Sequence, residues 1–83
     1  MKYRKKPVEV EAMQLTRNTF GEVLEFLGDN AIEPNEDECY VTVATLEGEI
    51  GAWQGWWIIK GIKGEFYPVR DDIFEATYEP IQE

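Results

Sequence analysis

The segment that most constrains the fold covers residues 56–60, which read WWIIK. Turn signals with glycine bound it on both sides, at residues 53–55 and 61–64. A strand directs alternate side chains to opposite faces, and this segment is apolar at both kinds of position. We therefore predict a central strand that other elements cover on two sides. Because 83 residues supply enough core for one domain only, we expect residues 1–83 to form a single domain around it.

Further strands are predicted from alternating apolar positions and from turns such as Glu47-Gly48. The acidic and polar segment 29–38 is predicted as a loop, because Pro34 interrupts it. The predicted strands cover residues 8–15, 39–46, 49–52, 56–60, 65–69 and 75–79.

One helix is predicted near the N-terminus, with a Thr19–Glu22 capping box at its start and Gly28 after its end. Between them, apolar residues follow the i, i+3, i+4, i+7 spacing of an amphipathic helix. These residues are Phe20, Val23, Leu24 and Leu27. Residues 70–74 are predicted as a single helical turn. The fold class is therefore α+β: one short helix packed on a curled antiparallel sheet of five to six strands, in a small barrel-like domain.

The inventory of reactive side chains argues against catalysis. The chain has no histidine and no serine, which excludes Ser-His-Asp triads, histidine general bases and histidine-containing metal sites. The single cysteine, Cys39, cannot form a disulfide within the chain or a cysteine-based zinc cluster, and we expect an ordinary buried thiol. We predict a protein without enzymatic activity, catalytic residues, metal site or cofactor.

The hydropathy pattern indicates a soluble protein. No apolar run approaches the roughly 18 residues of a membrane-spanning helix, and residues 1–7 lack the apolar segment of a signal peptide. A small chain without disulfides also suits a reducing compartment. We therefore expect a location inside the cell.

Charge is distributed unevenly along the chain. Eight basic residues stand against 17 acidic ones, for a net charge of −9, and half of the basic residues lie within the first six positions. The acidic body repels phosphates and attracts basic protein surfaces, although an acidic coat also serves solubility alone. We expect a host protein with a basic surface as partner, and neither direct contact with nucleic acid nor a membrane. The sequence leaves open whether the chain forms a homo-oligomer.

The three tryptophans, Trp53, Trp56 and Trp57, form the one feature suited to a ligand. One interpretation buries them on both faces of the central strand, since aromatic residues dominate small cores. The other exposes them, so that they stack on a flat ligand or insert into a protein partner. Nearby cations would then hold the phosphate of a nucleotide. The candidate residues for binding a partner or ligand are Trp53, Gln54, Trp56, Lys60, Lys63 and Arg70.

Most of the chain resembles a known family. The opening MKYRKKPVEVEAMQLT, LEGEI at residues 46–50 and WIIKGIKGEFYPVRDDIFEATYEP at residues 57–80 resemble small phage and prophage proteins with a PGDYG-type (also PGDW) motif, most of unknown function. Where the family reads Pro-Gly-Asp-Trp or Pro-Gly-Asp-Tyr, this chain has Gln-Gly-Trp-Trp at residues 54–57, which we interpret as a surface adapted to a particular partner. The resemblance implies a phage origin and a location in the host cytoplasm.

These observations lead to three hypotheses about function. The first is a non-enzymatic phage accessory protein whose acidic surface binds and inhibits a host factor, such as a nuclease of an antiphage defence (an anti-CRISPR-type inhibitor). The second is a protein that sequesters a nucleotide or cyclic dinucleotide through exposed tryptophans and basic residues. The third is a minor structural or regulatory phage protein. The identity of the target or ligand does not follow from the sequence.

Overall fold

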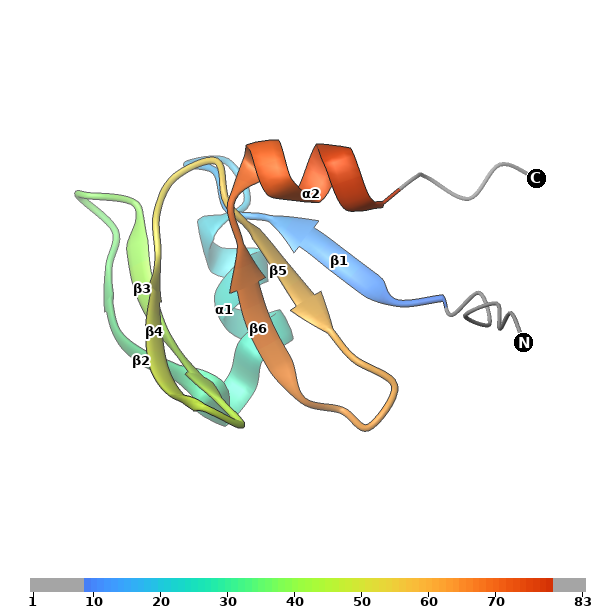
Figure 1. The fold of residues 1–83 in the computed structure, drawn as a ribbon. Coiled ribbons are helices and arrows are strands. Elements are labelled where there is room, and N and C mark those ends of the chain that lie inside the picture. The colour runs from blue at the N-terminus through green and yellow to red at the C-terminus, as the bar shows by residue number, and fades with distance from the viewer. Residues whose placement is uncertain (1–8, 79–83) are drawn as a thin grey trace, which may run out of the picture.

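The computed structural model describes residues 9–78, which form two helices and two three-stranded antiparallel sheets (Figure 1). The mixed α+β class predicted from the sequence is confirmed. The elements are β1 (Glu11–Gln14), α1 (Phe20–Leu27), a short 3-10 turn (Gly28–Asn30), β2 (Ala31–Asn35), β3 (Tyr40–Thr45), β4 (Gly48–Ala52), β5 (Trp57–Lys60), β6 (Phe66–Val69) and α2 (Asp71–Thr77). Neither helix of this part of the chain has the length and apolar character needed to cross a membrane.

The predicted central strand is confirmed, because β5 lies between β1 and β6 in the first sheet. In the middle of β5, Ile58 is opposite Met13 of β1 and Pro68 of β6. The edge position of β6 explains how Pro68, which has no N–H group, fits into a strand. The second sheet has the order β2-β3-β4, with β3 at its centre.

The expectation of one curled sheet of five to six strands is wrong, and residues 9–78 contain no closed barrel. The reason lies at residues 53–56, where the chain leaves β4 and pairs with β1. Here the Leu15 N–H donates to the Trp56 carbonyl at 2.8 Å, and the Gly55 N–H donates to the Leu15 carbonyl at 2.7 Å. These bonds extend the β1–β5 ladder, so the chain after β4 joins the other sheet.

The predicted loop at residues 29–38 is also wrong, because Ala31–Asn35 forms β2. Ala31 pairs with Val43, and Ile32 pairs with Thr42. The register shifts between Ile32 and Asn35, where Pro34 lies. A proline and exposed polar side chains are compatible with an edge strand, which pairs on one side only.

The C-terminal part of the chain has a second helix where a last strand at residues 75–79 was expected. Asp71–Thr77 forms α2, and residue 79 lies outside the described residues. The Tyr78 N–H donates to the Phe74 carbonyl at 2.9 Å, which continues the helical pattern. One helical turn separates Phe74 from Tyr78, and their rings stack with centroids 5.0 Å apart. This i, i+4 aromatic pair lies over the first sheet and favours helix here.

The predicted N-terminal helix is confirmed as α1, but its capping box is wrong. The Thr19 hydroxyl makes no cap hydrogen bond to α1. It donates instead to the Gln14 carbonyl at 2.6 Å and accepts from the Thr16 N–H at 2.9 Å. Thr19 therefore ties the start of the helix to the end of β1. At the other end, Gly28 has a φ of 57° and its N–H donates to the Leu24 carbonyl.

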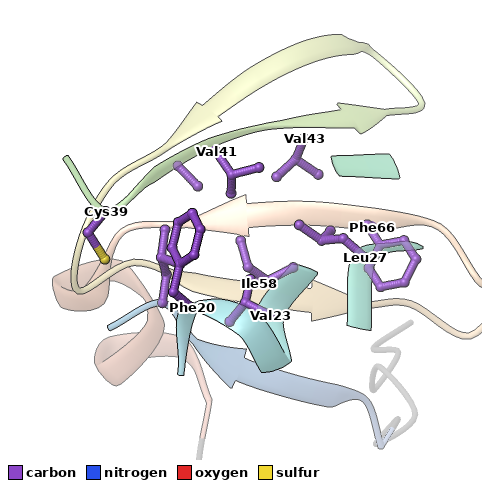
Figure 2. Close-up of a cluster of buried hydrophobic side chains, with 10 residues drawn as sticks. Phe20, Val23, Leu27, Cys39, Val41, Val43, Ile58 and Phe66 are labelled. Carbon is purple, nitrogen blue, oxygen red and sulfur yellow. The ribbon is translucent and has the colours of Figure 1, made fainter. Parts of the chain in front are cut away.

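The main core lies between α1 and the inner faces of the two sheets (Figure 2). Val41 and Val43 of β3 face Ile58 of β5 and the buried side of α1. The buried cluster comprises Leu15, Phe20, Val23, Leu27, Cys39, Val41, Val43, Ala52, Ile58 and Phe66. The other face of β5 carries Trp57, whose ring stacks on Phe74 of α2 at 4.1 Å between centroids. The two faces of β5 are thus covered by α1 and α2, in agreement with its apolar sequence.

Gly21 offers a test of the helix assignment. It lies in the first turn of α1 on the exposed side, and a Cβ atom there would meet no atom within 4 Å. A helix with glycine at such a position is less stable than one with alanine, because glycine loses more backbone entropy on folding. Gly21→Ala is therefore expected to raise the free energy of unfolding by about 0.5–1 kcal/mol, measured by urea denaturation. A loss of stability would contradict the open space around this position.

Candidate functional site

The structure exposes one of the three tryptophans and packs the other two against the domain. Trp53 is 51% exposed, and its ring lies against Tyr40 at 4.4 Å between centroids. Gln54, the next residue, is also exposed. Trp56 is half-buried and packs against the main core, while Trp57 lies under α2. Only Trp53 therefore has the exposed indole that a stacking surface requires.

Tyr40 takes its position because Gly51 has no side chain. A Cβ atom on Gly51 would collide with the ring and hydroxyl of Tyr40. The Tyr40 ring thus covers Gly51 and supports Trp53, while its hydroxyl lies 3.2 Å from that of Thr42. Gly51→Ala is expected to displace Tyr40 and shift the fluorescence emission of Trp53, at a cost of about 1 kcal/mol. An unchanged emission spectrum would contradict this contact.

Two of the predicted cations lie far from the exposed tryptophan. Lys60 ends β5 and is half-buried, with its Nζ 5.9 Å from the Phe66 ring centre. Lys63 lies in the following hairpin, which points away from the connection that carries Trp53 (Figure 1). The four residues of β5 separate the two ends by about 10 Å. The structure therefore does not place Lys60 or Lys63 beside the indole of Trp53.

Arg70 lies at the same end of the sheet as Trp53 but is already paired. A Cβ on Gly55 would be 3.8 Å from the carboxylate of Asp71, so the start of α2 adjoins the β4–β5 connection. The guanidinium donates two hydrogen bonds to Asp72, at 2.6 and 3.1 Å. These bonds lower the pKa of Asp72 below its ordinary value. The charge of Arg70 is thus largely compensated within the exposed start of α2.

A second surface feature, which the sequence reasoning missed, is an open groove of about 890 Å³. We call it the hairpin groove, because the β3–β4 and β5–β6 hairpins supply most of its lining. Val10 and the end of α2 contribute the remainder. Its apolar lining includes Leu46, Ile50, Ile62, Phe66, Tyr67 and Pro68.

The hairpin groove gathers apolar side chains that face solvent. Leu46 is 80% exposed, Ile62 73% and Ile50 39%, and these are three of the five large exposed hydrophobic residues within 9–78. Leu46 and Ile62 occupy hairpin turns, where a large aliphatic residue gains little burial. Large apolar residues inside turn segments are the sequence signal that could have indicated this surface. Contiguous exposed apolar groups of this kind are typical of interaction sites.

The polar side chains of the hairpin groove belong to two tyrosines, two glutamates and two threonines. The Tyr67 and Tyr78 hydroxyls lie 3.3 Å apart, and Glu47 and Glu65 stand on different hairpins. Burial, followed by the hydrogen bond with Tyr78, raises the pKa of Tyr67 to about 12. The phenol of Tyr67 therefore keeps its proton further into the alkaline range than an ordinary tyrosine does.

The raised pKa of Tyr67 predicts a loss of stability in alkali. The folded state holds this proton up to about pH 12, whereas an ordinary tyrosine releases it near 10.0. The stabilisation is therefore complete below pH 10 and is lost as the pH rises through 12. In Tyr67→Phe, stability should fall less steeply between these pH values than in the wild type, as measured by urea denaturation at each pH. Equal slopes for the two proteins would contradict the assignment.

The described residues include no cluster that suits metal binding. Among residues 9–78, no three Asp, Glu or Cys side chains come together in a way that could hold a metal ion. Cys39 is fully buried in the main core, without contact with solvent. The thiol is thus packed as an apolar group.

Comparisons with known proteins give no information about function, so the functional argument rests on the surface of the protein. No protein-family model, curated protein or solved structure matches the chain. Within residues 9–78, the features suited to binding are the exposed Trp53–Tyr40 pair and the hairpin groove. The groove combines apolar, hydroxyl and carboxylate groups.

Proposed function

We propose that this chain is a non-enzymatic protein that binds another protein through the hairpin groove. The observation that carries the proposal is the convergence of Leu46, Ile50 and Ile62 on one open groove. Covering these side chains would remove apolar surface from water, which is the main driving force of protein association. Three of the five large exposed hydrophobic residues within 9–78 line this one groove, and this grouping supports a role in binding.

The charge of the chain supports a partner with a basic surface. The net charge is −9, and four of the eight basic residues precede Pro7, outside the described residues. An acidic surface accelerates association with a basic protein and repels nucleic acid. Basic protein surfaces commonly serve to bind nucleic acid.

The biological role that we propose follows from this charge and from the sequence resemblance. The chain acts as a phage accessory protein in the host cytoplasm, where it covers a basic surface of a host factor and inhibits it. A nuclease of an antiphage defence has the surface chemistry that this role requires. The resemblance of residues 46–50 and 57–80 to small phage proteins supports the phage origin.

The geometry favours this role over sequestration of a nucleotide. That alternative needs a cation close to an exposed indole. Lys60 and Lys63 lie at the other end of β5, and Arg70 is paired with Asp72. A thermal-shift screen with nucleotides and cyclic dinucleotides tests this comparison, because a bound ligand raises the melting temperature. A clear shift at high ligand excess would favour the alternative.

A comparison of groove variants tests the proposed function. Wild-type protein, Leu46→Gln/Ile62→Gln and Ile73→Gln would each be immobilised and exposed to host-cell lysate. Ile73 is a matched control, because it is 52% exposed but belongs to α2 and does not line the groove. We expect the same partner on the wild type and on Ile73→Gln, and its loss from the double variant. Retention by a folded double variant, checked by circular dichroism, would refute the proposal.

A further inference from the structure

We propose that the hairpin groove accepts an extended, basic segment of its protein partner. The segment covers the apolar floor with alternate side chains and directs lysine or arginine side chains to Glu47 and Glu65. This inference rests on the proposed function and specifies the chemistry of the partner.

The positions of the apolar residues favour an extended polypeptide. Leu46 and Ile62 stand on different hairpins, and both are mostly exposed. A pocket for a small ligand usually encloses most of the ligand surface. Leu46 and Ile62 lie on separate hairpins of an open groove and cannot enclose a small molecule in this way. An extended segment can reach both hairpins, and its alternate side chains place one apolar face on Phe66 and Pro68.

The charges at the groove favour a basic segment. The described lining includes Glu47 on the β3–β4 hairpin and Glu65 on the β5–β6 hairpin, and it includes no lysine or arginine. Each hairpin therefore offers one carboxylate to a cation in the groove, and Lys60, whose Nζ lies 5.9 Å from the Phe66 ring centre, is the nearby positive charge that such a cation must avoid.

The structure places the carboxylate of Glu65 close to the turn of its own hairpin. Its side chain folds back over Gly61, where a Cβ atom would collide with the carboxylate. The carboxylate also accepts a hydrogen bond from the Lys63 N–H at 3.4 Å. The carboxylate of Glu65 therefore stays at the β5–β6 hairpin, within the lining of the groove.

The tyrosine pair suits the main chain of such a segment. When one hydroxyl of Tyr67 and Tyr78 donates to the other, the accepting hydroxyl keeps its own hydrogen. That hydrogen can be donated to a carbonyl group of the partner. An extended segment presents carbonyl groups along its length, because its main chain makes no hydrogen bonds within itself.

A peptide selection tests the inference. A bead-displayed library of random short peptides would be selected on the wild type and, in parallel, on Leu46→Gln/Ile62→Gln. We expect the wild type to enrich peptides that combine apolar with lysine or arginine residues, and the double variant to lose them. In Glu47→Gln/Glu65→Gln, affinity for an enriched peptide should fall roughly three- to tenfold, and its salt dependence should weaken.

The outcomes separate the two proposals. Enriched peptides that need Leu46 and Ile62 but are neutral or acidic would overturn the basic segment and leave the proposed function standing. The inference would be overturned if the selected peptides bound Leu46→Gln/Ile62→Gln as well as the wild type. It would also be overturned if no peptides were enriched. A dimer in sedimentation that Leu46→Gln/Ile62→Gln abolishes would assign the groove to a second copy and also overturn the inference.

Discussion

Replacement of Ile58 by alanine is expected to lower the free energy of unfolding by about 2–5 kcal/mol. Ile58 lies in the middle of the central strand, is fully buried and belongs to the main core (Figure 2). Removal of its outer carbons loses apolar burial and leaves a cavity between β5, β3 and α1. A domain of this size has a total stability of roughly 4–12 kcal/mol, so the variant is expected to lose a large part of it.

Ile62→Ala provides a matched control for this prediction. The substitution is chemically the same and lies four positions further along the chain, but Ile62 is 73% exposed. Its stability should stay within about 0.5 kcal/mol of the wild type. Thermal denaturation compares the two, and Ile58→Ala should melt at least about 10 °C lower. Similar melting temperatures for both variants would refute the central position of Ile58.

Elements defined by local patterns were predictable from the sequence. The helix at Phe20–Leu27 follows from its apolar spacing and its terminal glycine, and β5 follows from the apolar run at residues 56–59. The β3–β4 hairpin follows from alternation around a tight turn. In each case the buried side of the element is encoded in the segment itself.

Features that depend on distant pairing were not predictable. β2 is polar and contains Pro34, and it becomes a strand only because β3 offers a partner. The division into two sheets depends on whether the chain after Trp53 pairs with β4 or with β1, about 40 residues earlier. No local pattern distinguishes pairing with β4 from pairing with β1, because an antiparallel partner bonds the same backbone N–H and C=O groups in either case.

The candidate site shows the same limit. The exposure of Trp53 was one of two open interpretations, and its stacking on Tyr40 depends on Gly51 of a neighbouring strand. The hairpin groove combines Leu46 and Ile62, which are far apart in the sequence and come together through the packing of the two sheets. None of the six candidate residues named from the sequence lines the hairpin groove, because the groove forms only where the two hairpins pack together.

Replacement of Trp57 by alanine is expected to release α2 from the sheet and to lower the free energy of unfolding by about 3 kcal/mol. None of the seven residues of α2 is buried, and a helix of this length is unstable without packing. Phe74 of α2 stacks on Trp57 of the sheet with an angle of 8° between the rings, and the Tyr78 hydroxyl after the helix lies 3.3 Å from that of Tyr67. Backbone amides of α2 should therefore exchange with solvent much faster in Trp57→Ala, as measured by hydrogen exchange.

Trp57→Phe tests whether an aromatic ring at this position is enough to hold α2. The Trp57 Nε1 is buried and has no hydrogen-bond partner among residues 9–78, so the loss of this N–H removes an unfavourable buried group. A phenyl ring keeps an aromatic surface for Phe74, and we expect α2 to stay protected from exchange in this variant. If Trp57→Phe exposed α2 to exchange as strongly as Trp57→Ala, an aromatic ring at this position would not be enough to hold the helix, which would contradict the ring stack as the basis of its position.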